Sequence, residues 1–224
     1  MLAAWDRKLD LASRGAVFWR EFLAAFGPEE LLDAGRLFRL AFDPKRPVET
    51  PSGLAPAPAP GREDPIVSAL RVAKERLAKA GIALDAPLGA VQFTERGGAR
   101  IPVHGGGEAD GVLNKARLVP AERSRVLLPG LDAGEVLNPR SGLTSRGYPI
   151  NYGTSFVLLV ALTDSSPQAR AIMSYGASSD PESPQARDQT DLYSEKKLRT
   201  VRFSAAEIQA DPALRTQVID GARR

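Results

Sequence analysis

Cysteine is absent from the 224-residue sequence, and histidine occurs once, as His104. The absence of cysteine excludes disulfides, a thiol nucleophile and thiolate-bound zinc or iron–sulfur clusters. A single histidine also excludes a multi-histidine metal site built by this chain alone. We therefore expect neither a metal nor a cofactor.

Long apolar runs are also missing. The longest, residues 156–162 (FVLLVAL), has seven residues, whereas a membrane-spanning helix needs ~20. Residues 1–8 (MLAAWDRK) carry charges at positions 6–8 and lack the apolar core of a signal peptide. We expect a soluble chain without a membrane partner or a targeting signal of its own. It either stays in the cytoplasm or is a piece of a longer protein whose signal lies upstream.

Neither sign of charge is in large excess, since 30 Lys and Arg stand against 27 Asp and Glu. The net charge of +3 is too small to predict a nucleic-acid partner. Hydrophobic residues make up 43% of the sequence and charged residues 25%, which is ordinary for a globular protein. The length suffices for one domain or two small ones.

The first 64 residues contain two predicted parts. Residues 1–42 are predicted to be helical, with Ser13 as an N-cap and a break at Gly27-Pro28. The apolar positions of the two helical segments repeat at helical spacing: Val17, Phe18, Trp19, Phe22, Leu23 and Phe26, then Leu31, Leu32, Leu37, Phe38 and Phe42. Residues 43–64 are rich in proline and predict an extended surface strap or linker.

A third helix is predicted over residues 65–81. Asp64 is placed as its cap, Pro65 at its first position and Gly81 at its end. One face of this helix is apolar, formed by Ile66, Leu70, Ala73 and Leu77.

The remaining chain, residues 82–224, is predicted to be rich in strands, with short helices near its end. A hairpin is expected around Gly97-Gly98, between residues 91–93 and 100–103. The apolar run 155–163 predicts a strand buried on both faces, followed by a turn at 164–168 and a return strand at 169–175. The last expected elements are a helix near 188–198, a strand at 201–203 and a helix opened by the capping box Ser204-Ala205-Ala206-Glu207.

This order predicts an α+β fold with a mostly antiparallel sheet. A strand buried on both faces needs a second layer, supplied either by the helices of this chain or by chain that is missing from it.

His104 precedes Gly105-Gly106-Gly107, and a histidine beside glycines can act as a general base. A hydrolase triad also needs an activated serine, and no Gly-x-Ser-x-Gly elbow supplies one. We favour a strand end at which His104 bonds to backbone. The glycines with Gly111 lack the Lys-Ser/Thr of a phosphate loop, so they predict a turn before a strand at Val112-Leu113.

Two charged clusters are candidates for chemistry. Four carboxylates, Asp180, Glu182, Asp188 and Asp191, lie within twelve residues, but their spacing fits no EF-hand, and turn and capping roles explain them better. The basic run has too few aromatic neighbours for nucleic-acid stacking and predicts a solvated, salt-bridged face: Arg187, Lys196, Lys197, Arg199 and Arg202. The residues alone thus assign no catalytic, cofactor-binding or metal-binding position.

The most specific string is residues 174–185 (SYGASSDPESPQ), continuing to Asp188-Gln189. It resembles the C-terminal signature of the penicillin acylase family, in its aculeacin and acyl-homoserine-lactone acylase branch. Flanking pieces agree in order: residues 5–16, the strap at 42–54, the glycine hairpin at 100–114 and the strand at 153–157.

The resemblance implies an N-terminal-nucleophile hydrolase with an αββα sandwich. Such a precursor cuts itself and exposes a serine, whose hydroxyl attacks the amide while its own α-amine acts as base. Those groups lie upstream of the region matched here, and removal of Met1 would expose Leu2, which has no nucleophile. The resemblance therefore implies the C-terminal part of the large subunit, an upstream catalytic segment as partner, an acyl amide as substrate, and a periplasmic or secreted full-length precursor.

One position departs from the family pattern, since Gln185 stands where histidine is usual. Glutamine forms hydrogen bonds but does not titrate near neutral pH. Because the nucleophile of this family brings its own base, position 185 is expected to order the loop rather than to take part in catalysis.

Two functions follow. The chain is either part of an enzyme that hydrolyses linear amides, or a non-catalytic remnant or acyl-binding interaction module. An exposed apolar sheet face would argue against a chain that is stable alone.

Overall fold

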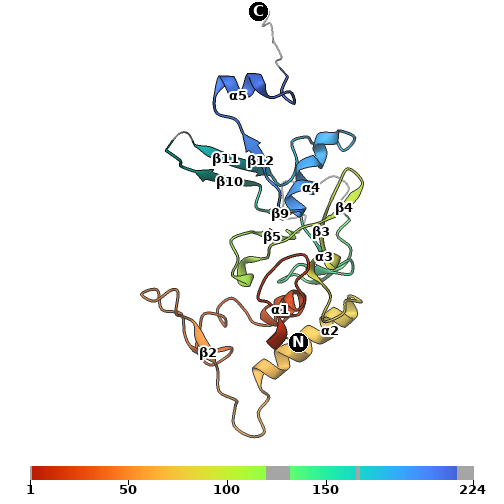
Figure 1. Cartoon of the computed structure of the whole chain (residues 1–224). Helices are drawn as coiled ribbons and strands as arrows, with labels where there is room; N and C mark the ends of the chain where they lie inside the picture. The colour runs from red at the N-terminus through yellow and green to blue at the C-terminus, as the bar shows by residue number, and fades with distance from the viewer. Residues whose placement is uncertain (1, 120–131, 165–166, 216–224) are drawn as a thin grey trace, which may run out of the picture.

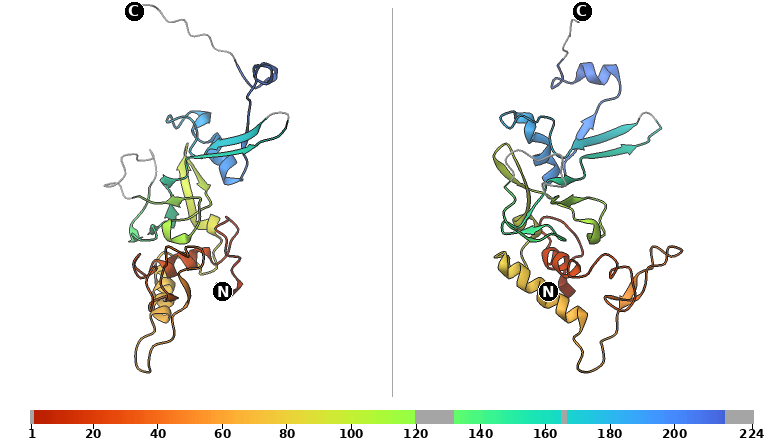
Figure 2. Two further views of the ribbon diagram at one scale, coloured as in Figure 1. Left: turned by 90° about the vertical axis from the view of Figure 1, so that its left-hand side faces the viewer. Right: turned by 180° about the vertical axis from the view of Figure 1, so that it is seen from behind.

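The computed structural model describes residues 2–119, 132–164 and 167–215. Its elements follow one another along an elongated molecule, with the N-terminal helices at one end and the C-terminal helix at the other (Figures 1 and 2). Between them lie the mixed strands of the middle part and a projecting β-hairpin. The α+β class predicted from the sequence is confirmed.

A one-turn helix, η1 (Leu2–Ala4), precedes the first α-helix, α1 (Ala16–Leu23). The N-cap of α1 is Gly15 rather than Ser13, so the predicted N-cap is wrong. Ser13 instead accepts a hydrogen bond from Trp5 Nε1 at 2.9 Å and donates one to Asp6 Oδ1 at 2.5 Å. The hydroxyl that was expected to cap the helix therefore orders the loop ahead of it. The hydrogen bond that Ser13 donates to Asp6 lowers the pKa of that carboxyl group.

Outside η1 and α1, residues 5–15 and 24–42 are not helical, so the prediction of helix over 1–42 is wrong for most of its length, including all of residues 28–42. The segment forms turns and strand β1 (Phe38–Leu40), which pairs antiparallel with β2 (Ser52–Leu54). Glu30 bonds to the backbone N–H of Gly27 at 2.7 Å and to Arg36 at 2.8 Å, and such local bonds compete with helix formation. Strand pairing across the chain then decides the conformation.

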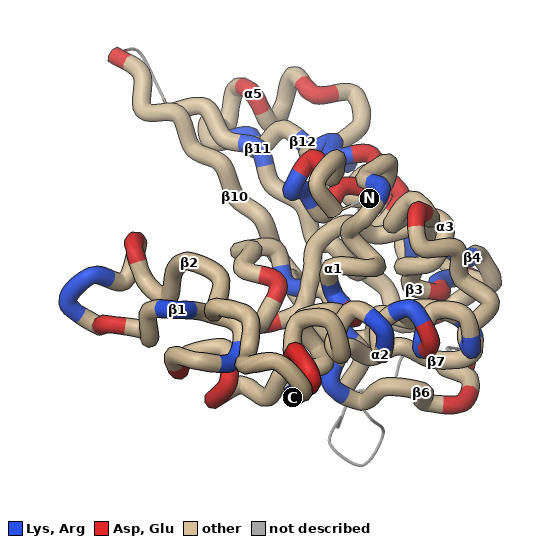
Figure 3. Tube along the Cα trace, turned by 90° about the horizontal axis from the view of Figure 1, so that it is seen from below, with Lys and Arg blue, Asp and Glu red and all other residues tan. Residues whose placement is uncertain are grey.

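The strap, residues 43–64, is extended around β2 and lies to one side of α1 and α2 (Figures 1 and 3). Helix α2 (Pro65–Lys79) follows as predicted. Asp64 caps it by accepting hydrogen bonds from the N–H groups of Ile66 and Val67. Its buried face carries Ala69, Ala73 and Leu77 and packs against α1.

The middle of the molecule is built from short strands. The predicted hairpin is confirmed as β3 (Gln92–Arg96) and β4 (Ala99–Pro102), preceded by the short helix α3 (Leu88–Val91). Strand β3 also pairs in parallel with β8 (Tyr148–Pro149). Two further antiparallel pairs join β5 (Ala116–Arg117) to β9 (Tyr152–Gly153) and β6 (Val136–Asn138) to β7 (Leu143–Thr144).

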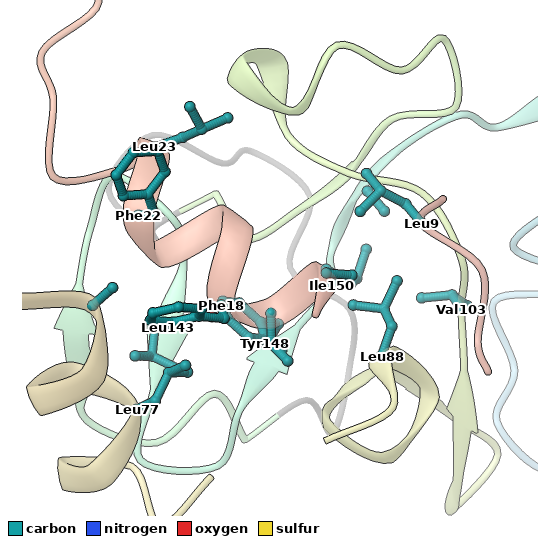
Figure 4. Packing of buried hydrophobic residues seen from close by; sticks show 14 of the residues in the cluster. Leu9, Phe18, Phe22, Leu23, Leu77, Leu88, Val103, Leu143, Tyr148 and Ile150 are labelled. Atoms are coloured by element: carbon teal, nitrogen blue, oxygen red, sulfur yellow. The ribbon is translucent and has the colours of Figure 1, made fainter. Parts of the chain in front are cut away.

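The hydrophobic core lies where α1, α2 and α3 meet these strands (Figure 4). Phe18 and Phe22 of α1, Leu77 of α2, Leu88 of α3 and Tyr148 of β8 are all buried there. Residues from the first and second halves of the chain thus share one core.

The apolar run at 155–163 forms strand β10 (Phe156–Ala161), which pairs with β11 (Gln168–Met173), and β11 with β12 (Arg199–Val201). The strand is predicted correctly, but its burial is not, because most of its large side chains are exposed. The hairpin projects away from the rest of the molecule (Figure 2), so too little of the described part of the chain is near enough to cover it. The predicted turn at 164–168 includes residues 165 and 166, which lie outside the described residues.

The C-terminal part matches the prediction apart from its boundaries. Helix α4 (Asp188–Ser194) ends earlier than residue 198, and β12 begins two residues before the expected strand at 201–203. Helix α5 (Ala205–Ala210) has the predicted capping box, in which Ser204 Oγ accepts from the N–H of Glu207 and Glu207 accepts from the N–H of Ser204.

Candidate functional site

A cavity of about 650 Å³ lies between the loop before α1, the turn after β4 and the end of α4. Its apolar lining residues are Leu9, Val112, Leu113, Val157 and Leu198. Four cations line it as well: Arg7, Lys8, Lys196 and Lys197. Asp10, which also lines the cavity, pairs with Lys196. Lys197 likewise pairs with Glu195, so two of the four cations already have carboxylate partners, and the apolar part of the lining is what suits a ligand.

His104 also lines this cavity and is held by both ring nitrogens. Its Nε2 is 3.0 Å from the carbonyl oxygen of Tyr193, so Nε2 carries the proton and donates it. Nδ1 then accepts a hydrogen bond from Asn114 Nδ2 at 2.7 Å. The Tyr193 hydroxyl closes the cluster by donating to Asn114 Oδ1 at 2.5 Å.

This cluster holds His104 neutral and leaves it no free nitrogen for catalysis. Burial lowers the pKa of His104 below its usual 6.5, although the bond to Tyr193 O opposes the shift. Burial raises the pKa of the Tyr193 hydroxyl. In the described part of the chain, no serine or threonine hydroxyl bonds to the imidazole. The sequence-based preference for a histidine bonded to backbone is confirmed, and the general-base alternative finds no support.

The glycine turn after β4 does not form a phosphate loop. The N–H groups of Gly105, Gly106 and Gly107 already donate to Leu9 O, Asn114 O and Asp110 Oδ2. A side chain at Gly106 would place its Cβ 2.4 Å from Asp110 Oδ2, so close packing requires this glycine.

The strand predicted at Val112-Leu113 is wrong. A one-turn helix, η2 (Glu108–Asp110), follows the glycines, and the next strand is β5 at Ala116–Arg117. The N–H of Gly107 is directed to the Asp110 carboxylate, and this bond closes the short turn before any strand begins.

Two buried ionic residues of α1 were missed by the sequence analysis. Arg20 donates to Asp110 Oδ2 at 3.0 Å, to Gln92 Oε1 at 2.6 Å and to Gly105 O at 3.2 Å. These bonds fix α1 to the turn that follows His104 in the sequence. The available signal was a charged pair, Arg20-Glu21, inside an otherwise apolar helical stripe.

Glu21 accepts hydrogen bonds from Asn138 Nδ2 at 2.7 Å and from the Tyr148 hydroxyl at 2.8 Å. Burial raises the pKa of Tyr148 well above its usual value, and the negative charge of Glu21 adds to the shift. Glu21 therefore ties α1 to β6 and β8 just as Arg20 ties it to the glycine turn.

The acidic cluster serves turns, as expected. Asp180 Oδ1 accepts from the N–H of Glu182 at 3.0 Å, and Asp188 Oδ1 from the N–H of Gln189 at 2.7 Å. Asp191 pairs with Arg187 at 3.4 Å. Among the described residues, no group of three or more His, Asp or Glu side chains is arranged to hold a metal ion.

The basic run is largely a salt-bridged face. Besides Arg187, Lys196 pairs with Asp10, Lys197 with Glu195 and Arg202 with Asp211. Both signs of charge are interspersed over this region (Figure 3). No helix within the described ranges is long and apolar enough to cross a membrane.

Gln185 lies on an exposed loop that includes η3 (Pro184–Ala186). Its side-chain oxygen accepts from Ser183 Oγ at 2.9 Å, and its carbonyl accepts from the N–H of Ala177 at 2.9 Å. These contacts are all within the loop and fit the expected ordering role.

Comparison with known proteins agrees with the resemblance found in the sequence. The model of the penicillin amidase family matches residues 1–210. Acyl-homoserine lactone acylase PvdQ of Pseudomonas syringae pv. tomato is 30% identical over 219 residues, covering 97% of this chain and 25% of that protein. PvdQ of Pseudomonas fluorescens is 33% identical over 228 residues, which cover 100% of this chain and 25% of that protein. Aculeacin-A acylase of Actinoplanes utahensis is 34% identical over 222 residues, which cover 96% of this chain and 23% of that protein. The chain spans about a quarter of the length of these relatives.

Proposed function

Because the chain belongs to the penicillin amidase family, we propose that it forms part of an amidohydrolase that cleaves the C–N bond of linear N-acyl amides. The observation that carries this proposal is the family match over residues 1–210, together with relatives that are acylases. Acyl-homoserine lactones and lipopeptides of the aculeacin type define the class of substrate to test.

Within this proposal the chain supplies scaffold, and another segment of the acylase supplies the nucleophile. The only histidine of the sequence is bonded through both ring nitrogens, and no described hydroxyl is activated by it. In an N-terminal-nucleophile hydrolase, the terminal serine hydroxyl attacks the amide carbonyl and its own amine accepts the proton. That arrangement needs no base from the present chain.

The buried ionic contacts of α1 support a scaffold role. Arg20 and Glu21 fix this helix to the glycine turn, β6 and β8 through hydrogen bonds of defined direction. A rigid frame of this kind can hold the elements that carry catalytic groups in place.

A chimera tests the proposal. The matching region of aculeacin-A acylase is replaced by residues 1–224, and release of free amine from aculeacin A is measured. We expect the chimera to mature by self-cleavage and to hydrolyse the substrate, whereas the same chimera without its nucleophilic serine should be inactive. A chimera that matures but never hydrolyses an acyl amide would contradict the proposed function. Turnover by the isolated chain would contradict the assignment of the nucleophile to another segment.

A further inference from the structure

The β10–β11 hairpin has one face made entirely of apolar residues. Residues paired across an antiparallel ladder share a face, and neighbours along a strand alternate between faces. The register pairs Phe156 with Met173, Leu158 with Ala171 and Val160 with Ala169, which places all six on the same side. We call this set the apolar hairpin face.

The large residues of this face are open to solvent. The exposed fractions are 55% for Phe156, 50% for Leu158, 49% for Val160 and 46% for Met173. Strand β10 carries no charged residue at all (Figure 3). Four half-exposed large apolar side chains on adjacent positions form a patch rather than scattered surface residues, and such patches mark interaction surfaces.

The opposite face of the same hairpin differs in composition and contacts. Its pairs are Val157 with Ile172, Leu159 with Arg170 and Ala161 with Gln168. Ile172 is buried in the core and Val157 packs against it, so this face is anchored to the molecule near α4. A half-covered antiparallel sheet normally turns its polar face to water. Here both faces are open beyond the anchor, with Leu159 60% exposed on the partly polar face, and the wholly apolar face is left exposed as well.

We propose that the apolar hairpin face is the surface on which the remaining segment of the acylase packs, through an apolar sheet or helix of its own. This inference rests on the proposed function, because it identifies the partner as the part of the acylase outside the chain. The relatives are about four times as long as the region matched, so most of the protein that would surround this hairpin lies outside residues 1–224.

The charge beside the patch indicates one property of the partner. Arg199 of β12 pairs with Ala171 and therefore lies on the same face. No ion pair to Arg199 is formed among the described residues, whereas Arg187 and Arg202 each have a carboxylate partner. The packing segment is expected to combine an apolar surface with a carboxylate at the edge near Arg199.

The absence of cysteine gives a direct test. Leu158→Cys places a thiol on the apolar hairpin face, and Leu159→Cys places one on the opposite face of the same strand, where Leu159 is 60% exposed. Each variant is made in the isolated chain and in the acylase chimera described above. Labelling by a water-soluble maleimide is then followed at each site by peptide mass spectrometry.

In the isolated chain, both thiols should react at similar rates. In the chimera, position 158 should react at least about tenfold more slowly, while position 159 changes by less than about threefold. Equal reactivity at 158 in both settings would overturn the inference, and so would equal protection of both positions. Concentration-dependent protection of 158 in the isolated chain would assign the face to a second copy instead.

The labelling result is independent of turnover. An inactive chimera with position 158 protected would refute the proposed function and support the interface. An active chimera in which position 158 stays reactive would support the proposed function and refute the interface. If the chimera does not accumulate, binding of an apolar fluorescent dye to the isolated chain still tests whether the apolar hairpin face is an open binding surface. Leu158→Ser should lower dye binding clearly more than Leu159→Ser, and equal effects would overturn the inference.

Discussion

Replacing Asp110 with asparagine tests how far the fold depends on the buried charge pair between α1 and the glycine turn. Arg20 Nε lies 3.0 Å from Asp110 Oδ2, and the two side chains are 5% and 3% exposed. The other acceptors of the guanidinium, Gln92 Oε1 and Gly105 O, are neutral. Asp110→Asn therefore keeps the shape of the site but leaves a buried positive charge without its counter-charge.

The magnitude follows from what remains around Arg20. Removing one partner of a buried pair costs about 3–5 kcal/mol, because the other charge stays desolvated. Two neutral acceptors persist, and the Tyr148 ring lies 4.8 Å from the guanidinium carbon. These contacts place the expected loss at the lower end, about 3 kcal/mol of unfolding free energy. For a chain of this size, that corresponds to a fall in Tm of about 6–12 °C.

The assay is urea unfolding at low protein concentration, followed by circular dichroism and tryptophan fluorescence. Trp19 lies in α1 beside Arg20, so its emission reports on the helix concerned. Glu75→Gln is the matched control, because it removes the carboxylate of an exposed ion pair. The side chain of Glu75 is 62% exposed and that of its partner Arg71 is 57% exposed. That control should change stability by less than about 0.5 kcal/mol. A loss below about 1 kcal/mol for Asp110→Asn would refute the reasoning that the pair is buried and essential.

Three further changes test other parts of the fold. Because burial lowers the pKa of His104 in the folded chain, the unfolded chain binds the proton first as the pH falls. Stability should therefore decrease from about pH 7 downwards until the folded pKa is passed. His104→Gln should flatten this slope, and NMR titration of the single imidazole should give a pKa below 6.5; a higher value would contradict the assignment. Gly106→Ala should cost more than about 2 kcal/mol because its Cβ meets Asp110, whereas Gly107→Ala, with no atom nearer than 3.9 Å, should stay within about 0.5 kcal/mol in urea unfolding. Asp64→Ala should cost about 1 kcal/mol through loss of the α2 cap, and an unchanged midpoint would show that the cap bonds are unimportant.

Elements set by local chemistry could be predicted from the sequence. Asp64, Pro65 and Gly81 place both ends of α2 within a few residues, and the capping box at Ser204 places the start of α5. The glycine pair between β3 and β4 fixes their turn. In each case the residues that determine the structure are neighbours in the sequence, so no knowledge of distant contacts is required.

Elements set by distant contacts could not be predicted. Residues 28–42 satisfy a helical apolar pattern, yet β1 forms because β2 is available to pair with it. The parallel pairing of β3 with β8 joins residues more than fifty positions apart. Periodicity records which side chains are apolar but not which backbone they will meet, and tertiary pairing overrides it.

The buried ionic residues of α1 show a related limit at the candidate site. An amphipathic reading of this helix assigns Arg20 and Glu21 to the solvent face, because they interrupt the apolar stripe. In the structure nearly every residue of α1 is buried, so the helix has no solvent face at all. A charged residue in such a helix must find partners inside the protein. Those partners, Asp110 and Tyr148 among them, come from parts of the chain that the local pattern does not specify.

Strand β10 shows the opposite case, because its sequence predicts more burial than the structure has. Its continuous apolar sequence predicts burial on both faces, whereas about half or more of each of four large side chains is exposed in the chain by itself: Phe156, Leu158 and Val160 on one face and Leu159 on the other. Composition reflects the surroundings of a residue in the complete protein, while exposure reflects only the atoms present. A run of positions at which the two disagree therefore marks where chain outside these residues should pack. Single exposed residues such as Val48 and Leu113 do not carry this argument, because isolated apolar side chains are normal on protein surfaces.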